Sequence, residues 1–192
     1  MQLIKVLSVV ACFAVLVHGE EVWKRLEQEW TKEDARHILS DSPWAKRVTF
    51  IQDTGTQITV VVRWETARPV QAALAIIGET PVAVSDPART AVLVVTAQKE
   101  RGTPPEYSDK WDRLEVVVND GHAYERRIVE LKDNFPAHVF AFARDQILAP
   151  EFRLPFASVD TRKVRLRLRL GDSKAVCSFS LSAMKFRGAP SL

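Results

Sequence analysis

The sequence feature that most constrains the fold lies near the C-terminus, where residues 163–170 have the sequence KVRLRLRL. Apolar and basic side chains alternate over the whole segment, and this period of two places one set in a core and the other on the opposite face of a β-strand. Gly171-Asp172 forms a two-residue turn, and residues 173–181 provide the returning strand. We therefore predict a β-hairpin with a defined register. Its inward pairs are Leu170 with Ser173, Leu168 with Ala175, Leu166 with Cys177 and Val164 with Phe179.

The outward side chains of this hairpin are mostly basic. We call the following residues the basic face: Lys163, Arg165, Arg167, Arg169 and Lys174. Such an array suits an anionic polymer, a phosphate-rich surface or an acidic partner, because arginine binds carboxylate and phosphate through two parallel hydrogen bonds. The alternative is an ordinary charged sheet face, whose arginines pair with acids of a neighbouring strand such as Glu125 or Glu130. The basic face is therefore one candidate binding surface.

Residues 1–19 are predicted to be a secretory signal peptide. Lys5 supplies the positive start, residues 7–17 are apolar apart from one serine, and residues 17–19 provide a cleavage site. The apolar run is shorter than the roughly 20 residues that a membrane-spanning helix needs. The segment ending at Cys12 also resembles a lipoprotein cleavage box, and we expect a membrane contact only if Cys12 is lipidated. Because the apolar run continues past Cys12, a periplasmic or secreted protein is the favoured interpretation.

The mature chain is nearly balanced in charge. Removing residues 1–19 takes away Lys5 and no acid, which leaves 173 residues with 26 basic and 24 acidic side chains. A nucleic-acid-binding protein usually carries a strong excess of Lys and Arg, so a nucleic acid is not the expected partner. The length suits one domain with its own core. Cys177 is the one cysteine left, so no intramolecular disulfide forms and we expect a small core residue there.

Residues 20–46 are predicted to form a helical arm in two pieces. The first piece has apolar residues at i, i+3 and i+7, one face of a helix: Trp23, Leu26 and Trp30. The second piece begins with a capping box in which Thr31 pairs with Asp34. An amphipathic arm this short is not stable alone, so we expect it to pack on the sheet that follows.

Residues 47–192 are predicted to form an antiparallel β-sandwich of about eight to nine strands. The expected strands are residues 48–52, 58–65, 91–97, 114–118, 123–131, 137–143, 163–170 and 173–181, with a weaker one at 152–156. Turn residues separate them at intervals of roughly 8 to 12 residues, which is typical of a sandwich or barrel. One crossover helix is expected between Pro69 and Gly78, packed against an open end of the sheet. The fold class is therefore mainly β.

Several short motifs follow one another along the mature chain. They are Trp30-Thr31 with Asp34-Ala35 and Ile38-Leu39, then Asp41-Ser42-Pro43-Trp44-Ala45, then Ala67-Arg68-Pro69-Val70, and finally SAMKFRG at residues 182–188. Their order resembles that of a group of uncharacterised exported bacterial β-rich proteins. The resemblance implies an exported β-rich protein without a known activity, and it assigns no functional residue.

The sequence carries no catalytic or metal-binding motif that we can identify. The mature histidines, His37, His122 and His138, are not spaced as a zinc site requires, and we expect them to be structural. There is no Gly-x-Ser-x-Gly elbow, and the seven glycines supply no phosphate-binding loop. Acid pairs such as Asp109 with Asp112 have no separation fixed by the sequence, so they do not indicate a glycosidase. We assign no catalytic residue, no metal and no cofactor.

A second candidate surface is the long connection at residues 98–113, which carries Tyr107 and Trp111. Long loops on a rigid sandwich often bind ligands, and these aromatic side chains suit a carbohydrate or protein contact. We therefore expect a non-enzymatic exported protein that binds a protein or a cell-envelope component. The alternatives are a carbohydrate- or polyanion-binding module that uses the basic face or this loop, and, third, a hydrolase.

Overall fold

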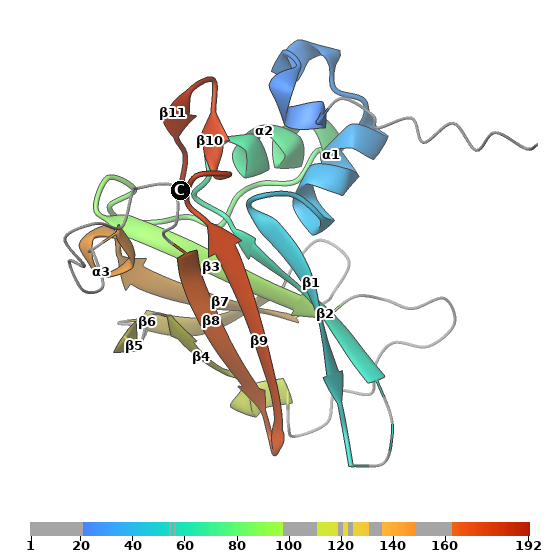
Figure 1. Cartoon of the computed structure of the whole chain (residues 1–192), viewed down its shortest axis with the longest axis vertical. Coiled ribbons are helices and arrows are strands. Elements are labelled where there is room, and N and C mark those ends of the chain that lie inside the picture. Colours follow the sequence, from blue (N-terminus) through green and yellow to red (C-terminus); the bar gives the residue numbers. More distant parts are fainter. Residues whose placement is uncertain are drawn as a thin grey trace, which may run out of the picture.

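The structure is a computed structural model of the chain. It describes residues 21–53, 55, 57–97, 111–118, 121–122, 125–130, 136–148 and 163–192. The predicted signal peptide with Cys12, the expected strand at 152–156 and Tyr107 lie outside the described residues. In the part described, two antiparallel sheets enclose a common core, and two helices lie at one end of them (Figure 1).

Each sheet is antiparallel throughout. The larger sheet has the order β1-β2-β3-β7-β6, with β1 Ala45–Ile51, β2 Gln57–Trp64, β3 Thr90–Ala97, β7 Pro136–Ala143 and β6 Glu125–Glu130. The smaller sheet has the order β5-β4-β8-β9, with β5 Gly121–His122, β4 Glu115–Val118, β8 Lys163–Leu170 and β9 Ser173–Ser180. A small hairpin pairs β10 (Lys185–Phe186) with β11 (Ala189–Pro190). The predicted mainly β sandwich is confirmed, and β1 begins three residues before its expected start at residue 48.

The hairpin of β8 and β9 has the predicted register, with Leu170 opposite Ser173 and Val164 opposite Phe179. Burial alternates along β8, where every apolar side chain is at most 2 % exposed and every basic one is exposed. Gly171 has a φ of 60°, the left-handed conformation that a two-residue hairpin turn needs and that glycine adopts without a steric penalty. The alternating sequence is therefore sufficient to fix which side of β8 faces the core.

Trp64 connects the two sheets within the core. Its ring lies 6.4 Å from Phe142 in the same sheet and 5.9 Å from Phe179 in the other, and all three side chains are fully buried. Full burial of an aromatic side chain contributes about 1.5–3 kcal/mol, and an edge-to-face ring contact adds to this. A smaller apolar cluster covers the other face of the large sheet, where Val82 and Val84 pack on β3 and β7.

The two main helices lie side by side across one end of the sandwich (Figure 1). Helix α1 covers Lys32–Ser40 and begins with the predicted capping box, in which the backbone N–H of Asp34 donates to the Thr31 hydroxyl over 3.1 Å. Helix α2 covers Arg68–Ile77, with proline in its first turn and Gly78 at its end in the left-handed conformation. The predicted start and end of this crossover helix are confirmed. None of the described helices is long and apolar enough to cross a bilayer.

The first piece of the helical arm differs from the prediction. It forms two 3₁₀ turns, η1 (Val22–Lys24) and η2 (Glu27–Glu29), separated by extended residues, and Leu26 is 53 % exposed. The expected apolar stripe is wrong because these turns bend the segment back over α1, where Arg25 Nη2 donates to Asp34 Oδ1 over 2.7 Å. Trp30 is still buried, and its Nε1 donates to the Val22 carbonyl over 3.0 Å. Tertiary contacts override helical periodicity in a segment this short.

The C-terminal residues complete the helical end. Trp44 Nε1 donates to the Ser191 carbonyl over 2.7 Å, and the Trp44 ring lies 6.4 Å from Phe186 in β10. The Arg68 backbone N–H at the start of α2 donates to the Ser191 hydroxyl over 3.0 Å. Segments from both ends of the described chain thus pack together.

Four short elements were not among the predicted ones. They are the strands β10 and β11, the helix α3 (Arg144–Leu148) and the turn η3 (Trp111–Arg113).

Replacing Leu166 with Ala should lower the free energy of unfolding by about 2–5 kcal/mol, because a fully buried side chain is lost and a cavity is left. Val176→Ala is the matched control on the adjacent strand, where the side chain is 63 % exposed, and its effect should stay within about 0.5 kcal/mol. Urea denaturation followed by tryptophan fluorescence measures both changes. Equal losses in the two variants would contradict the assignment of Leu166 to the core.

Candidate functional site

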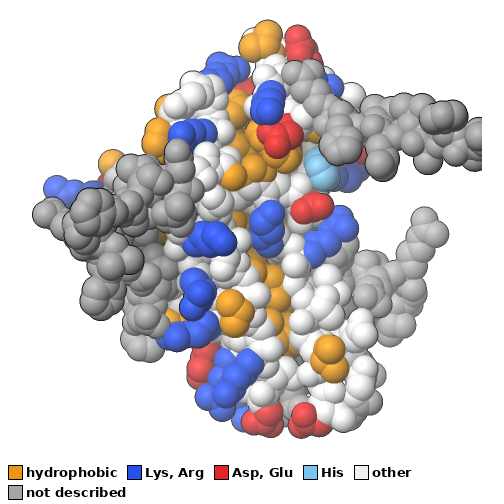
Figure 2. Space-filling view, in the orientation of Figure 1, with side chains coloured by type: hydrophobic (Ala, Val, Ile, Leu, Met, Phe, Trp, Pro, Cys, Tyr) orange, Lys and Arg blue, Asp and Glu red, His pale blue; other side chains and the backbone are white. Residues whose placement is uncertain are grey.

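The basic face occupies the outward side of β8 and β9. Lys163, Arg165, Arg167 and Arg169 are all exposed along β8, and Lys174 of β9 is exposed opposite Arg169. Figure 2 shows Lys and Arg side chains gathered on the side of the molecule on which β8 and β9 lie in Figure 1. Alternate residues of a strand are about 6.7 Å apart, so the four cations of β8 extend over about 20 Å. The structure therefore brings all five predicted residues onto one surface.

Few acids accompany this face in its own sheet. Glu115 of β4 lies opposite Arg169, and it is the one acid in the described strands of the smaller sheet. Glu125 and Glu130, which we considered as partners of the arginines on a neighbouring strand, belong to β6 in the other sheet, so their strand is not adjacent to β8. Arg169 Nε donates to the Gly171 carbonyl over 2.9 Å, which directs this guanidinium toward the hairpin turn. β4 is the neighbour of β8 and also pairs with β5, and this strand order is not readable from periodicity.

The position of Trp111 does not suit the predicted loop contact. The side chain lies in η3 and is only 5 % exposed, and its ring packs edge-on at 5.0 Å from His138 of β7. Burial leaves little of the indole for stacking on a sugar. The loop candidate therefore has Trp111 in the core, while Tyr107 lies outside the described residues.

His138 is fully buried, and its neighbours shift its acid–base behaviour. Its ring stacks on Phe140 at 6.1 Å, and its Nδ1 lies 3.4 Å from Arg126 Nη2. Burial and, to a lesser extent, the positive charge of Arg126 lower the pKa of His138 to about 4, against the opposing effects of a backbone hydrogen bond at Trp111 and of the charge of Asp112. Neither His138 Nε2 nor Trp111 Nε1 has a hydrogen-bond partner among the described residues. Alternation with Phe140 indicates that His138 points inward, but the sequence does not reveal this environment.

The other residues considered for chemistry are dispersed. His37 is exposed on α1 and stacks on Trp23, with ring centroids 6.3 Å apart, and His122 lies in β5. Cys177 faces inward and packs against the core, and burial raises the pKa of its thiol to about 12, so it stays protonated. Across the described ranges, no three His, Cys, Asp or Glu side chains are grouped as a metal site requires.

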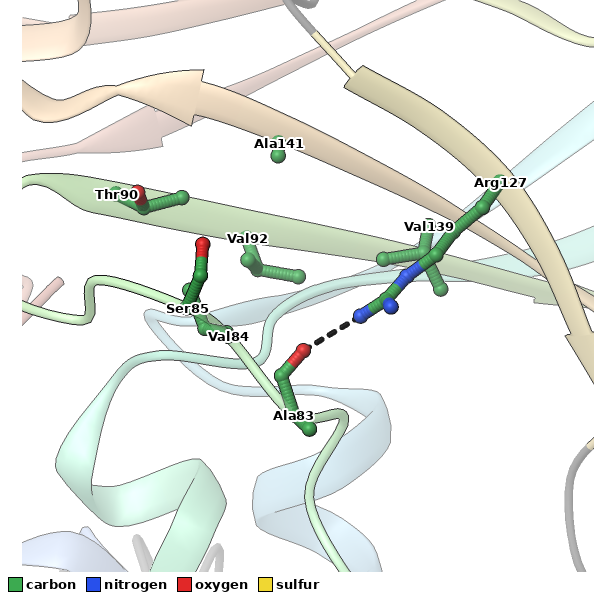
Figure 3. A pocket seen from close by; sticks show the side chains of 8 residues that line it. All are labelled: Ala83, Val84, Ser85, Thr90, Val92, Arg127, Val139 and Ala141. Atoms are coloured by element: carbon green, nitrogen blue, oxygen red, sulfur yellow. Dashed lines mark hydrogen bonds between the residues drawn. The ribbon is translucent and has the colours of Figure 1, made fainter.

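A small hollow lies on the outer face of the larger sheet, with a volume of about 130 Å³. Its floor is formed by Val92, Val139 and Ala141, and Ser85 and Thr90 stand at one side (Figure 3). Arg127 reaches from β6 over this floor and donates to the Ala83 carbonyl. The guanidinium thereby holds the connection between α2 and β3 against the sheet. The contact explains how this connection covers an apolar sheet face.

Comparisons with known proteins add no functional assignment to this geometry. No family model, no curated protein sequence and no solved structure matches the chain. The resemblance in motif order therefore stays a prediction.

Lowering the pH from 7 to 4 should destabilise the fold through His138. Its pKa is about 4 in the folded chain and 6.5 as an ordinary value, so the unfolded state binds the extra proton in this range and stability falls as the pH falls. The loss is on the order of 3 kcal/mol by pH 4. The difference between the wild type and a His138→Phe variant in urea denaturation at each pH isolates this contribution from that of the carboxylates. Parallel stability curves for the two proteins would contradict it.

Proposed function

We propose that the chain is an exported, non-enzymatic binding protein that holds an anionic polymer of the cell envelope on its basic face. The observation that carries this proposal is the row of four exposed cations on β8, extended by Lys174 on β9. Cations spaced along a strand match repeated charges along a polymer better than the single charge of a small ligand. Export itself is supported by the sequence of residues 1–19.

The buried side chains and the hydrogen-bonded backbone of β8 hold the basic face in place, which lowers the entropic cost of binding. Each basic residue of β8 alternates with a side chain that is at most 2 % exposed in the core. β8 also lies between β4 and β9, so its backbone is hydrogen-bonded on both sides. The positions of the cations along the strand are therefore fixed before a ligand arrives, and less conformational freedom is lost on binding.

The composition of the face favours a polymer over a folded protein partner. The centres of protein interfaces are usually rich in aromatic and apolar side chains, which bury together and supply most of the affinity. On β8 and β9 the one large apolar side chain that is strongly exposed is Val176, at 63 %. Neutral sugars are disfavoured in the same way, because neither strand presents an outward aromatic ring for stacking. The basic face can therefore bind a ligand mainly through charge.

Binding of polygalacturonate and polyphosphate, with uncharged dextran as the comparison, tests the proposal. The triple variant Arg165→Glu, Arg167→Glu, Arg169→Glu should lose at least about tenfold in affinity for the polyanions, since reversing three charges removes more than 1.4 kcal/mol of attraction. Affinity of the wild type should fall steeply as salt rises from 50 to 300 mM, because exposed charges are screened. Isothermal titration calorimetry measures each constant.

The matched control is the triple variant Lys32→Glu, Arg36→Glu, Arg89→Glu, which changes the net charge equally at exposed positions away from β8 and β9. It should keep most of the affinity. Equal losses in the two triple variants would reduce the effect to net charge and contradict a defined site. Binding that does not change with salt, or binding only to an acidic protein, would contradict the polymer as the ligand.

A further inference from the structure

A second, larger hollow lies at the helical end of the molecule. Its volume is about 400 Å³, within the range of roughly 300–1,000 Å³ that is usual for small-molecule sites. Its walls come from η1, from Pro43 before β1 and from the region of the β10–β11 hairpin. The lining residues belong to segments far apart in the sequence, and none of them is part of the basic face. This hollow is therefore a separate candidate site.

The walls of the hollow are positively charged. Lys24, Lys185 and Arg187 line it together with one acid, Glu21. Lys24 Nζ lies 3.2 Å from Glu21, but both side chains are more than half exposed, so the pair is well solvated. Arg187 lies 3.7 Å from Glu27, whose carboxylate also binds Arg68 at 3.3 Å. Because Glu27 is shared by two guanidinium groups, the acids among the described residues offset only part of the positive charge.

Trp23 provides an ordered apolar wall. Its ring is half-buried and stacks on His37, with the two planes 20° apart. Its contact with Trp44 is edge-to-face at 6.0 Å between centroids. Two ring contacts hold the indole in place beside the cations, so the hollow combines a flat apolar surface with positive charge. This combination suits a ligand that has both a ring and an anionic group.

Arg187 has a strained backbone conformation. Among the described residues it is the one non-glycine with positive φ, at 51°, and Gly188 follows at 78°. A turn with both central residues in this region favours asparagine or glycine at the first position. Arginine there instead places a guanidinium over the Phe186 ring, 5.3 Å from its centroid, and at the hollow. Strained residues of this kind are concentrated at functional sites, and the strain at Arg187 therefore supports a functional role for this hollow.

We propose that this hollow binds a small ring-shaped organic anion. The phosphate or carboxylate group lies between Lys185 and Arg187, and the ring lies against Trp23. Phosphate and carboxylate share the geometry that a guanidinium recognises, so both are included in the class. This site does not depend on the function proposed for the basic face.

Titration calorimetry on the purified chain with four probes tests the proposal. Phenyl phosphate and benzoate carry both a ring and a charge, whereas benzyl alcohol lacks the charge and inorganic phosphate lacks the ring. At least one of the first two should bind at least fivefold more tightly than each of the last two, and the better of them identifies the anionic group. No binding of either, or equal binding of benzyl alcohol, would overturn the proposal.

Arg187→Gly separates binding from stability. Glycine relieves the turn conformation while the guanidinium is lost, so affinity for the better probe should fall at least fivefold and the melting temperature should stay or rise. Lys185→Gln should lower the affinity as well without touching the turn. Arg169→Gln on the basic face should leave it unchanged. Unaltered affinity in both Arg187→Gly and Lys185→Gln would overturn the site.

Discussion

The fold depends on the alternation of β8, whose apolar side chains fill the core while its cations stay in water. A slip of one residue in the pairing with β9 would bring Lys163 and the arginines into the core and expose Leu166. Burying an unpaired charge costs far more than any single contact can return, so the register is strongly specified. The register that places the apolar side chains of β8 in the core therefore also places its cations on the outward side, where they form the basic face.

Period-two patterns made most of the sandwich predictable. In a strand that is buried on one face, the alternation of apolar and polar residues shows which side faces the core. β8, β9 and β2 were placed within one or two residues. The bounds of helix α2 were equally predictable, because Pro69 favours a helix start and Gly78 a helix end through their own backbone conformations. Strand order was not readable, since it depends on which distant segments meet. This is why β4, and not β6 with Glu125 and Glu130, is the neighbour of the arginines.

The elements that escaped prediction are those whose conformation comes from tertiary contacts. The segment with Leu26 has a helical pattern yet forms 3₁₀ turns, because its partners lie on α1. The β10–β11 hairpin is only two residues deep on each strand and carries no alternation to detect. Trp111 lies near a long connection in the sequence but packs on His138 in the interior. Of the two candidate surfaces, the basic face follows from a strand pattern and lies on described residues, whereas of the predicted loop contact only Trp111 is described, and it is buried.

The contact between Trp44 and Ser191 spans 147 residues of sequence, and the start of α2 also bonds to Ser191. A chain that emerges N-terminus first from a ribosome or a translocation pore cannot make these contacts until Ser191 has emerged. Closing so long a loop is slow, so the helical end is completed late in folding. Until that moment the indole of Trp44 and the first turn of α2 have no partner there. The order of synthesis thus places the closure of the helical end after the emergence of Ser191.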